Sequence, residues 1–244
     1  ERVESAHASV AAKRDSLAAF ADRIRDVSTS SGGVEQAGGM VGGGVSVVSQ
    51  RTDQREVVRS AFAETVGQYT GGDSVVAGLR AELGDDVALA FAPTTNTQFS
   101  PHLKRQLLSQ TTARRQELSV TLTALDRERE SVATHREIVD ETVEWLVEAD
   151  ETPLSNLGFD RLRARHERLE TLEREIVDAT AARQGLLDAT TSEDATVGLA
   201  HRSLVASLYE DYPVEYPVLS TLTRVLDVCL EAKQAVRDHL VRRA

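Results

Sequence analysis

The longest uninterrupted segment of this chain begins at Ser100-Pro101, because neither glycine nor proline occurs between His102 and Ala149. Serine is a favoured N-cap and proline is tolerated at the first helical position, so this pair predicts the start of a helix. At 1.5 Å per residue that helix reaches roughly 70 Å. The other helices of the chain are therefore expected to pack along it.

The segment DETPLSNLGF, residues 150–159, ends the long helix and is expected to reverse the chain. A further helix is predicted from about residue 160 to 189. A short connection between two helices with heptad patterns favours an antiparallel hairpin, which covers residues 101–189. The predicted seam is formed by Leu118, Leu122, Leu125, Arg129, Val132, Arg136, Val139, Val143 and Leu146 on the first helix, and by Leu162, Leu169, Leu172, Ile176, Ala179 and Leu186 on the second. Its two arginines are expected to snorkel at the edge or to pair with carboxylates.

Heptad spacing also marks the two ends of the chain. Residues 1–28 read as an N-terminal coiled-coil helix in which Lys13 fills one seam position. Residues 52–244 are expected to form a helical bundle, which contains the hairpin and C-terminal helices within 194–243. The N-terminal seam comprises Val3, Ala6, Val10, Leu17, Phe20, Ile24 and Val27, and the C-terminal one comprises Leu219, Leu222, Leu226, Cys229, Val236 and Leu240.

A second helix is predicted to start at Thr52 or Asp53. Shorter helices are predicted at about residues 74–83 and 85–91. The run VSVVS at 45–49 resembles a strand, but a single strand cannot satisfy its own backbone. The predicted fold class is therefore all-α, an elongated helical bundle with a long antiparallel coiled-coil hairpin.

Residues 29–51 contain the stretch GGVEQAGGMVGGG, which carries one charge, at Glu35. A phosphate loop needs Lys and then Ser or Thr after its second glycine, where Gly39 and Met40 stand here. The stretch holds too many glycines and serines for a membrane span. We interpret it as a flexible linker with a reach of about 20 Å.

The net charge is −11, and Lys13, Lys104 and Lys233 are the only lysines among 28 basic residues. An acidic, lysine-poor surface stays hydrated in concentrated salt, where screening shortens self-repulsion to a few ångströms. A halophilic source is the first interpretation. The alternative is a GC-rich genome that favours arginine, alanine, valine and aspartate codons.

The setting and chemistry are constrained by what the sequence contains. Cys229 is the single cysteine, so an internal disulfide and a cysteine-based zinc site are excluded. No secretory signal and no apolar run of transmembrane length is present, which predicts a cytoplasmic protein. His166 and Glu170 share a helical face and suit either a loose metal site or an ordinary solvated pair, the second being favoured. No catalytic residue, metal site or cofactor is predicted.

Two clusters are the candidate interaction surface. Arg161, Arg165 and Arg168 fall on one side of a helix and suit a phosphate backbone, an acidic partner or pairing with neighbouring carboxylates. Three tyrosines stand in the segment YEDYPVEYP, where they suit a recognition surface or the packing of a helix junction. They are Tyr209, Tyr212 and Tyr216.

The segments AAKRDSLAAFADRI, VRSAFAETV and LYEDYPVEYPVLSTLTRV resemble a family of haloarchaeal helical proteins that is known as a domain of unknown function. The resemblance implies a halophilic archaeon and a helical fold. It implies no activity, ligand or catalytic residue.

These observations predict a non-enzymatic helical scaffold or protein-interaction protein that binds a protein partner, or a second copy of itself, through heptad seams. One alternative is a regulatory protein that contacts nucleic acid through the arginine-rich helix, which the acidic net charge disfavours. The other is an enzyme whose site is assembled inside the bundle from distant residues.

Overall fold

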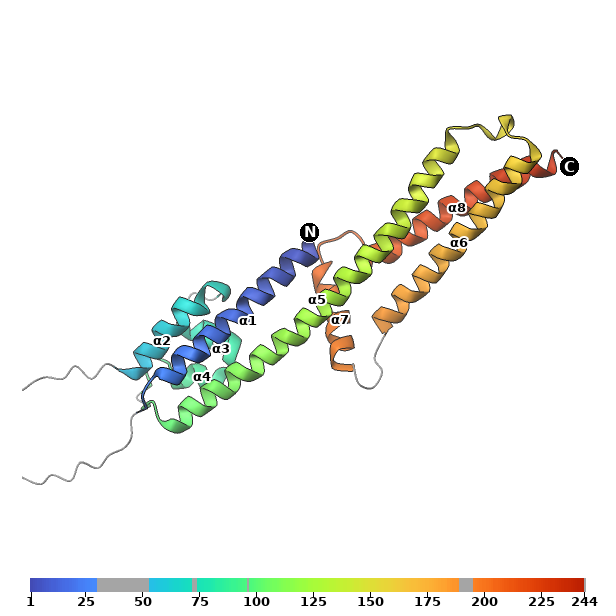
Figure 1. Cartoon of the computed structure of the whole chain (residues 1–244). Coiled ribbons are helices and arrows are strands. Elements are labelled where there is room, and N and C mark those ends of the chain that lie inside the picture. The colour runs from blue at the N-terminus through green and yellow to red at the C-terminus, as the bar shows by residue number, and fades with distance from the viewer. Residues whose placement is uncertain (30–52, 72–73, 96, 189–194, 244) are drawn as a thin grey trace, which may run out of the picture. The chain divides into compact units, whose positions relative to one another are not determined.

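A computed structural model describes residues 1–29, 53–71, 74–95, 97–188 and 195–243 (Figure 1). This part of the chain is helical and contains no strand, which confirms the predicted all-α class. The expected linker 29–51, apart from Thr29, and its glycine-rich stretch lie outside the described residues. The helices are α1 (Arg2–Asp26), α2 (Gln54–Thr65), α3 (Val75–Leu83), α4 (Asp85–Ala90), α5 (Pro101–Asp150), α6 (Phe159–Asp188), α7 (Ala195–Leu208) and α8 (Pro217–Val241).

The predicted helix starts have the expected caps. The Asp53 side chain accepts a hydrogen bond from the Arg55 backbone N–H, which opens α2. The Ser100 hydroxyl accepts from the Leu103 N–H at 3.2 Å and opens α5. Each cap satisfies a backbone donor that the first helical turn leaves without a partner.

The helices group into two compact units, and the boundaries fall inside α1 and α5. Unit 1 comprises Glu1–His7 and Val120–Ala244, and unit 2 comprises Ala8–Ser119.

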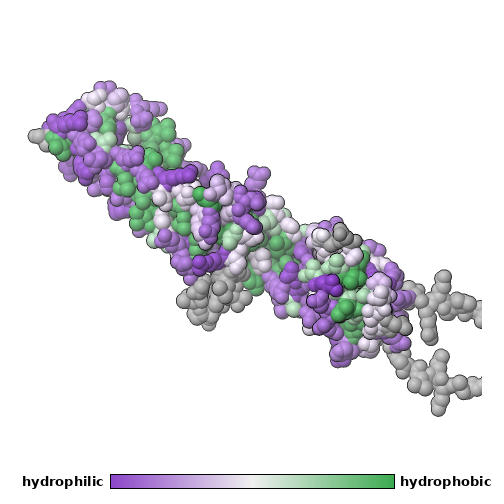
Figure 2. Space-filling model, turned by 180° about the vertical axis from the view of Figure 1, so that it is seen from behind, coloured by the Kyte–Doolittle hydropathy of each residue, from purple (hydrophilic) through white to green (hydrophobic). Residues whose placement is uncertain are grey.

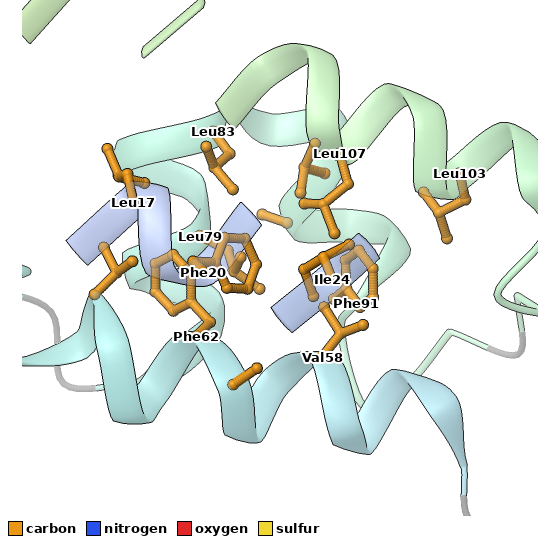
Figure 3. Packing of buried hydrophobic residues seen from close by; sticks show 14 of the residues in the cluster. Leu17, Phe20, Ile24, Val58, Phe62, Leu79, Leu83, Phe91, Leu103 and Leu107 are labelled. Atoms are coloured by element: carbon orange, nitrogen blue, oxygen red, sulfur yellow. The ribbon is translucent and has the colours of Figure 1, made fainter. Parts of the chain in front are cut away.

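Unit 2 is built around an apolar core between α1, α2, α3, α4 and the first part of α5. Phe20 and Phe62 meet edge to face at 5.4 Å, and both are fully buried (Figure 3). Lys13, which fills the gap in the N-terminal seam, pairs at 2.5 Å with the buried carboxylate of Glu82. Arg114 approaches the same carboxylate at 3.1 Å. A buried charge requires such partners, which explains a lysine among apolar positions.

Unit 1 contains three long helical segments, from α5, α6 and α8. Glu128 pairs with Arg183 and His135 with Ala179, so residue numbers rise along α5 as they fall along α6. Lys233 of α8 bonds Glu173 of α6. Arg243 donates to the carbonyl of Ser155, so α8 is also antiparallel to α6 (Figure 1). Within unit 1 the second half of α5 thus runs antiparallel to α6, as in the predicted hairpin, and α8 packs along α6 as well.

Part of the predicted seam of α5 is displaced by one residue. Arg129, Arg136 and Val143 were expected in the seam, but the buried positions are Glu128, His135 and Thr142. Arg129 pairs with Asp126 and Arg136 with Asp140 at the surface. On α6 the seam ends in Leu187 rather than Leu186, and Arg183 occupies the buried position seven residues after Ile176. Glu128, His135 and Arg183 are stabilised by partners on other helices, which the apolar pattern of one helix does not reveal. Thr142 instead donates to the carbonyl of Ile138 within α5.

Candidate functional site

The centre of unit 1 holds a buried cluster of polar side chains around Glu128. Arg183 donates to both carboxylate oxygens of Glu128, at 2.8 and 2.9 Å. His201 Nε2 lies 3.0 Å from Oε2, and the Tyr209 hydroxyl donates to Oε1 at 2.9 Å. The side chains of Glu128, Arg183 and His201 are at most 2 % exposed. We call these four residues the Glu128 cluster.

The cluster keeps its carboxylate ionised. Burial of Glu128 favours the neutral acid, but hydrogen bonds from His201 and Arg183 and the charge of Arg183 outweigh burial and lower the pKa of Glu128. Burial and the neighbouring carboxylate raise the pKa of the Tyr209 hydroxyl, which therefore remains a donor. Since both oxygens of Glu128 already accept two bonds each, this carboxylate is occupied in holding helices together.

A second layer of polar contacts extends the cluster along α5. Arg183 also donates to the Ser131 hydroxyl at 2.9 Å. The ring of His135 faces two carbonyl oxygens, with Nδ1 2.5 Å from that of Ser131 and Nε2 3.0 Å from that of Ala179. Among the described residues, Arg183 Nε and His201 Nδ1 have no hydrogen-bond partner.

A groove of about 340 Å³ lies beside the cluster and is the candidate binding site of unit 1. Tyr209 belongs to both the cluster and the lining of the groove. His135 also lines the groove, and its ring bonds the Ala179 carbonyl within the core. We call this hollow the unit 1 groove. Its apolar walls include Val3, Val132, Val139, Val218 and Leu222.

One wall of the groove is aromatic and is held by Arg2. The rings of Tyr209 and Tyr212 meet edge to face at 5.5 Å. The guanidinium of Arg2 lies 5.1 Å from the centre of the Tyr212 ring. It also donates to the Leu208 carbonyl at 3.1 Å and pairs with Asp211 at 2.9 Å. These contacts connect the first turn of α1 to the end of α7 within unit 1.

The structure brings together the three tyrosines that the sequence singled out. Tyr209 is buried, Tyr212 is 45 % exposed, and Tyr216 packs in the apolar cluster that contains Leu187, Val205 and Tyr209. Tyr209 and Tyr216 therefore pack at the helix junction, whereas Tyr209 and Tyr212 line the groove.

The three arginines of the candidate surface lie on α6 and are not part of the groove. Arg161 is exposed. Arg165 donates to the Thr152 carbonyl at 3.3 Å, and Arg168 lies 3.7 Å from Glu175. Two of the three are thus engaged by neighbouring groups of the same unit.

The remaining candidates have ordinary surroundings. His166 Nδ1 and Glu170 lie 3.9 Å apart, as expected of a solvated pair. No group of three or more histidine, cysteine, aspartate or glutamate side chains that could hold a metal occurs in the described part of the chain. Cys229 is 1 % exposed, and its pKa is raised by burial and by the charge of Glu173.

The Glu128 cluster was not predicted from the sequence. One signal was available, because Glu128, His135 and Thr142 follow one another at heptad spacing, one residue before the chosen stripe. A second was the i, i+4, i+8 spacing of His201, Val205 and Tyr209, all of which are buried.

Comparison with known proteins places the chain in a family. Residues 1–233 match the family described as Domain of unknown function (DUF7260). The chain belongs to this family. No curated protein and no solved structure matches the DUF7260 chain.

The surface of the DUF7260 chain is mixed in polarity. Hydrophilic residues cover much of the face seen in Figure 2, with smaller apolar patches between them. Within the described residues, no helix has the length and apolar character needed to cross a membrane.

Proposed function

We propose that this DUF7260 chain is a non-enzymatic helical interaction protein whose recognition site is the unit 1 groove. The observation that carries the proposal is the joint role of Tyr209. Its ring lines the groove, and its hydroxyl is fixed by the buried carboxylate of Glu128. A concave apolar surface mounted on a rigid polar core suits binding, because a site that is already formed loses little entropy when it is filled.

The groove takes the place of the heptad seams as the proposed contact. Seam residues such as Leu125, Leu162 and Ile176 are fully buried by other helices of the same chain. A partner or a second copy that used those residues would have to displace an existing core. The groove needs no such rearrangement.

The acidic chain gives less support to the nucleic-acid alternative. On the arginine-rich helix, Arg165 contacts the Thr152 carbonyl and Arg168 contacts Glu175, both in the same unit. The net charge of the chain is −11. Binding to nucleic acid needs lysine or arginine side chains that are free to neutralise phosphates and so release the counterions of the nucleic acid.

The test uses two threonines of α8 that differ in their relation to the groove. Both are exposed, and each hydroxyl donates at 2.9 Å to the carbonyl four residues earlier. Thr221 lines the groove, whereas Thr223 does not. A photo-reactive benzoyl-phenylalanine is placed at either position of the full chain, and cells of the source organism are irradiated.

We expect a discrete adduct from position 221 and none from position 223. Mass spectrometry of the adduct then distinguishes a protein from a small molecule. Equal labelling at the two positions, or no adduct at either, would reject the groove as the recognition site.

A further inference from the structure

We infer that the unit 1 groove binds a small amphipathic acid, a molecule with an apolar body and a single carboxylate. This inference rests on the proposed function, since it names the chemical class of the occupant. Three observations support it: the size of the groove, the separation of its apolar and polar parts, and the sign of the charges that line it.

The size of the groove favours a small molecule over a partner helix. A helix that docks in a groove needs room for apolar anchors over two or more turns. The hollow of about 340 Å³ is at the lower end of the range of small-molecule sites. Its walls come from four places in unit 1: the N-terminus with the first turn of α1, the second half of α5, the segment that follows α7 and the start of α8.

The apolar walls would take the body of the ligand. Val132 and Val139 stand two turns apart on α5, while Val218 and Leu222 stand one turn apart on α8. Tyr212 adds an aromatic face that is 45 % exposed. Water on such a surface is released when an apolar chain covers it, which is the main favourable contribution to binding.

The charges that line the groove favour an anion. Arg2 and Arg136 contribute guanidinium groups to the lining. Glu1 is the one acidic residue among the described lining residues. Arg2 pairs with Asp211 and Arg136 with Asp140, but these pairs are exposed and therefore weak. A ligand carboxylate can accept from either guanidinium, and such charge-assisted hydrogen bonds are roughly twice as strong as neutral ones.

The probes are octanoate and octylammonium, which share an apolar chain and differ in the sign of the headgroup. Each is titrated by calorimetry into the full chain at the same ionic strength and below its micelle concentration. We expect saturable binding of octanoate that is about tenfold tighter than that of octylammonium, since one charge-assisted contact has roughly this effect.

Two matched pairs of variants locate the binding. Thr221→Trp fills the groove and is expected to abolish octanoate binding, whereas Thr223→Trp leaves it unchanged. Arg136→Gln removes a lining cation and is expected to weaken octanoate about fivefold with little effect on octylammonium. Its control is Arg163→Gln, because Arg163 makes an equivalent exposed i, i+4 pair with Glu167 on α6. Circular dichroism checks that each variant is folded.

Every result supports or overturns the inference. The inference is overturned by no saturable octanoate binding, by equal octanoate binding to Thr221→Trp and Thr223→Trp, by octylammonium that binds as tightly as octanoate or more tightly, or by equal effects of Arg136→Gln and Arg163→Gln. A protein adduct at position 221, together with octanoate that fails to compete with it, overturns the inference while retaining the groove as a recognition site. An absent adduct at position 221 is the separate result that rejects the proposed function.

Discussion

Glu128 on α5 and Arg183 on α6 form a bidentate salt bridge with N–O distances of 2.8 and 2.9 Å. Both side chains are almost entirely buried. Such a pair specifies how two helices align, because a shift along either helix separates both bonds. The loss of only one partner is costly, since it leaves the other charge buried without compensation.

The first prediction separates the partners of this pair. Arg183→Met is expected to lower the free energy of unfolding by about 3–5 kcal/mol, because Glu128 keeps its charge in the core. The double variant Glu128→Gln with Arg183→Met is expected to recover part of this loss, since glutamine still accepts from Tyr209. Urea unfolding followed by circular dichroism measures both. A double variant that is less stable than Arg183→Met would contradict the account.

The second prediction concerns acid. The pKa of Glu128 is lowered in the folded chain, so its contribution to stability is complete above the ordinary carboxyl pKa of 4.5 and is lost as the pH falls through the lowered value. The difference in unfolding free energy between the parent and Glu128→Gln should therefore shrink as the pH falls below about 4.5. A difference that grows in this range would assign the opposite sign to the shift.

The third prediction uses two helical glycines with opposite surroundings. A Cβ atom at Gly78 would stand 2.8 Å from the Thr70 hydroxyl and 3.0 Å from the Phe62 ring, whereas at Gly185 it would meet nothing within 4 Å. Gly78→Ala should therefore destabilise unit 2 by roughly 1–3 kcal/mol. Gly185→Ala should stabilise α6 by up to about 1 kcal/mol, because alanine favours helix. Melting temperatures that shift in the same direction would refute the contrast.

The fourth prediction tests the register of α5. Leu125 is fully buried, so Leu125→Asp should cost more than about 3 kcal/mol and disrupt the hairpin. Val143 is 43 % exposed on the same helix, so Val143→Asp should cost less than about 1 kcal/mol. If the two variants were equally destabilised, the buried stripe would follow the seam first predicted from the sequence.

The fifth prediction follows from the charge. With a net charge of −11, self-repulsion is strongest at low ionic strength, and the melting temperature should rise as potassium chloride is raised from low to molar concentration. Sucrose at equal osmolality is the control, since it is excluded from the surface but does not screen charge. An unchanged melting temperature would count against a halophilic adaptation.

The helices were predictable because their signals are local. The caps at Asp53 and Ser100 and the proline that begins α8 each act within one turn, and the helix starts match them. The glycine-free run of α5 leaves that helix without a break along its length. The shorter helices α3 and α4 also lie where their expected segments were placed.

The candidate site was harder to predict because its partners are distant in sequence. Arg183, His201 and Tyr209 stand 55, 73 and 81 residues after Glu128. The apolar pattern of α5 alone places Leu122 and Val143 in the seam. Heptad spacing then also places Arg129 and Arg136 there. Glu128 is buried because other parts of the chain bring donors to its carboxylate. The pattern of α5 alone does not reveal which residues supply those donors.

The separation in sequence between Glu128 and its partners also affects the order in which the chain can fold during synthesis. Unit 2 is one continuous segment, Ala8–Ser119, and all of it has been synthesised before Glu128 is added. The carboxylate of Glu128 then lacks Arg183 for 55 further residues and Tyr209 for 81. A nascent chain can thus complete unit 2 early, whereas the second half of α5 must wait in water for the C-terminal third.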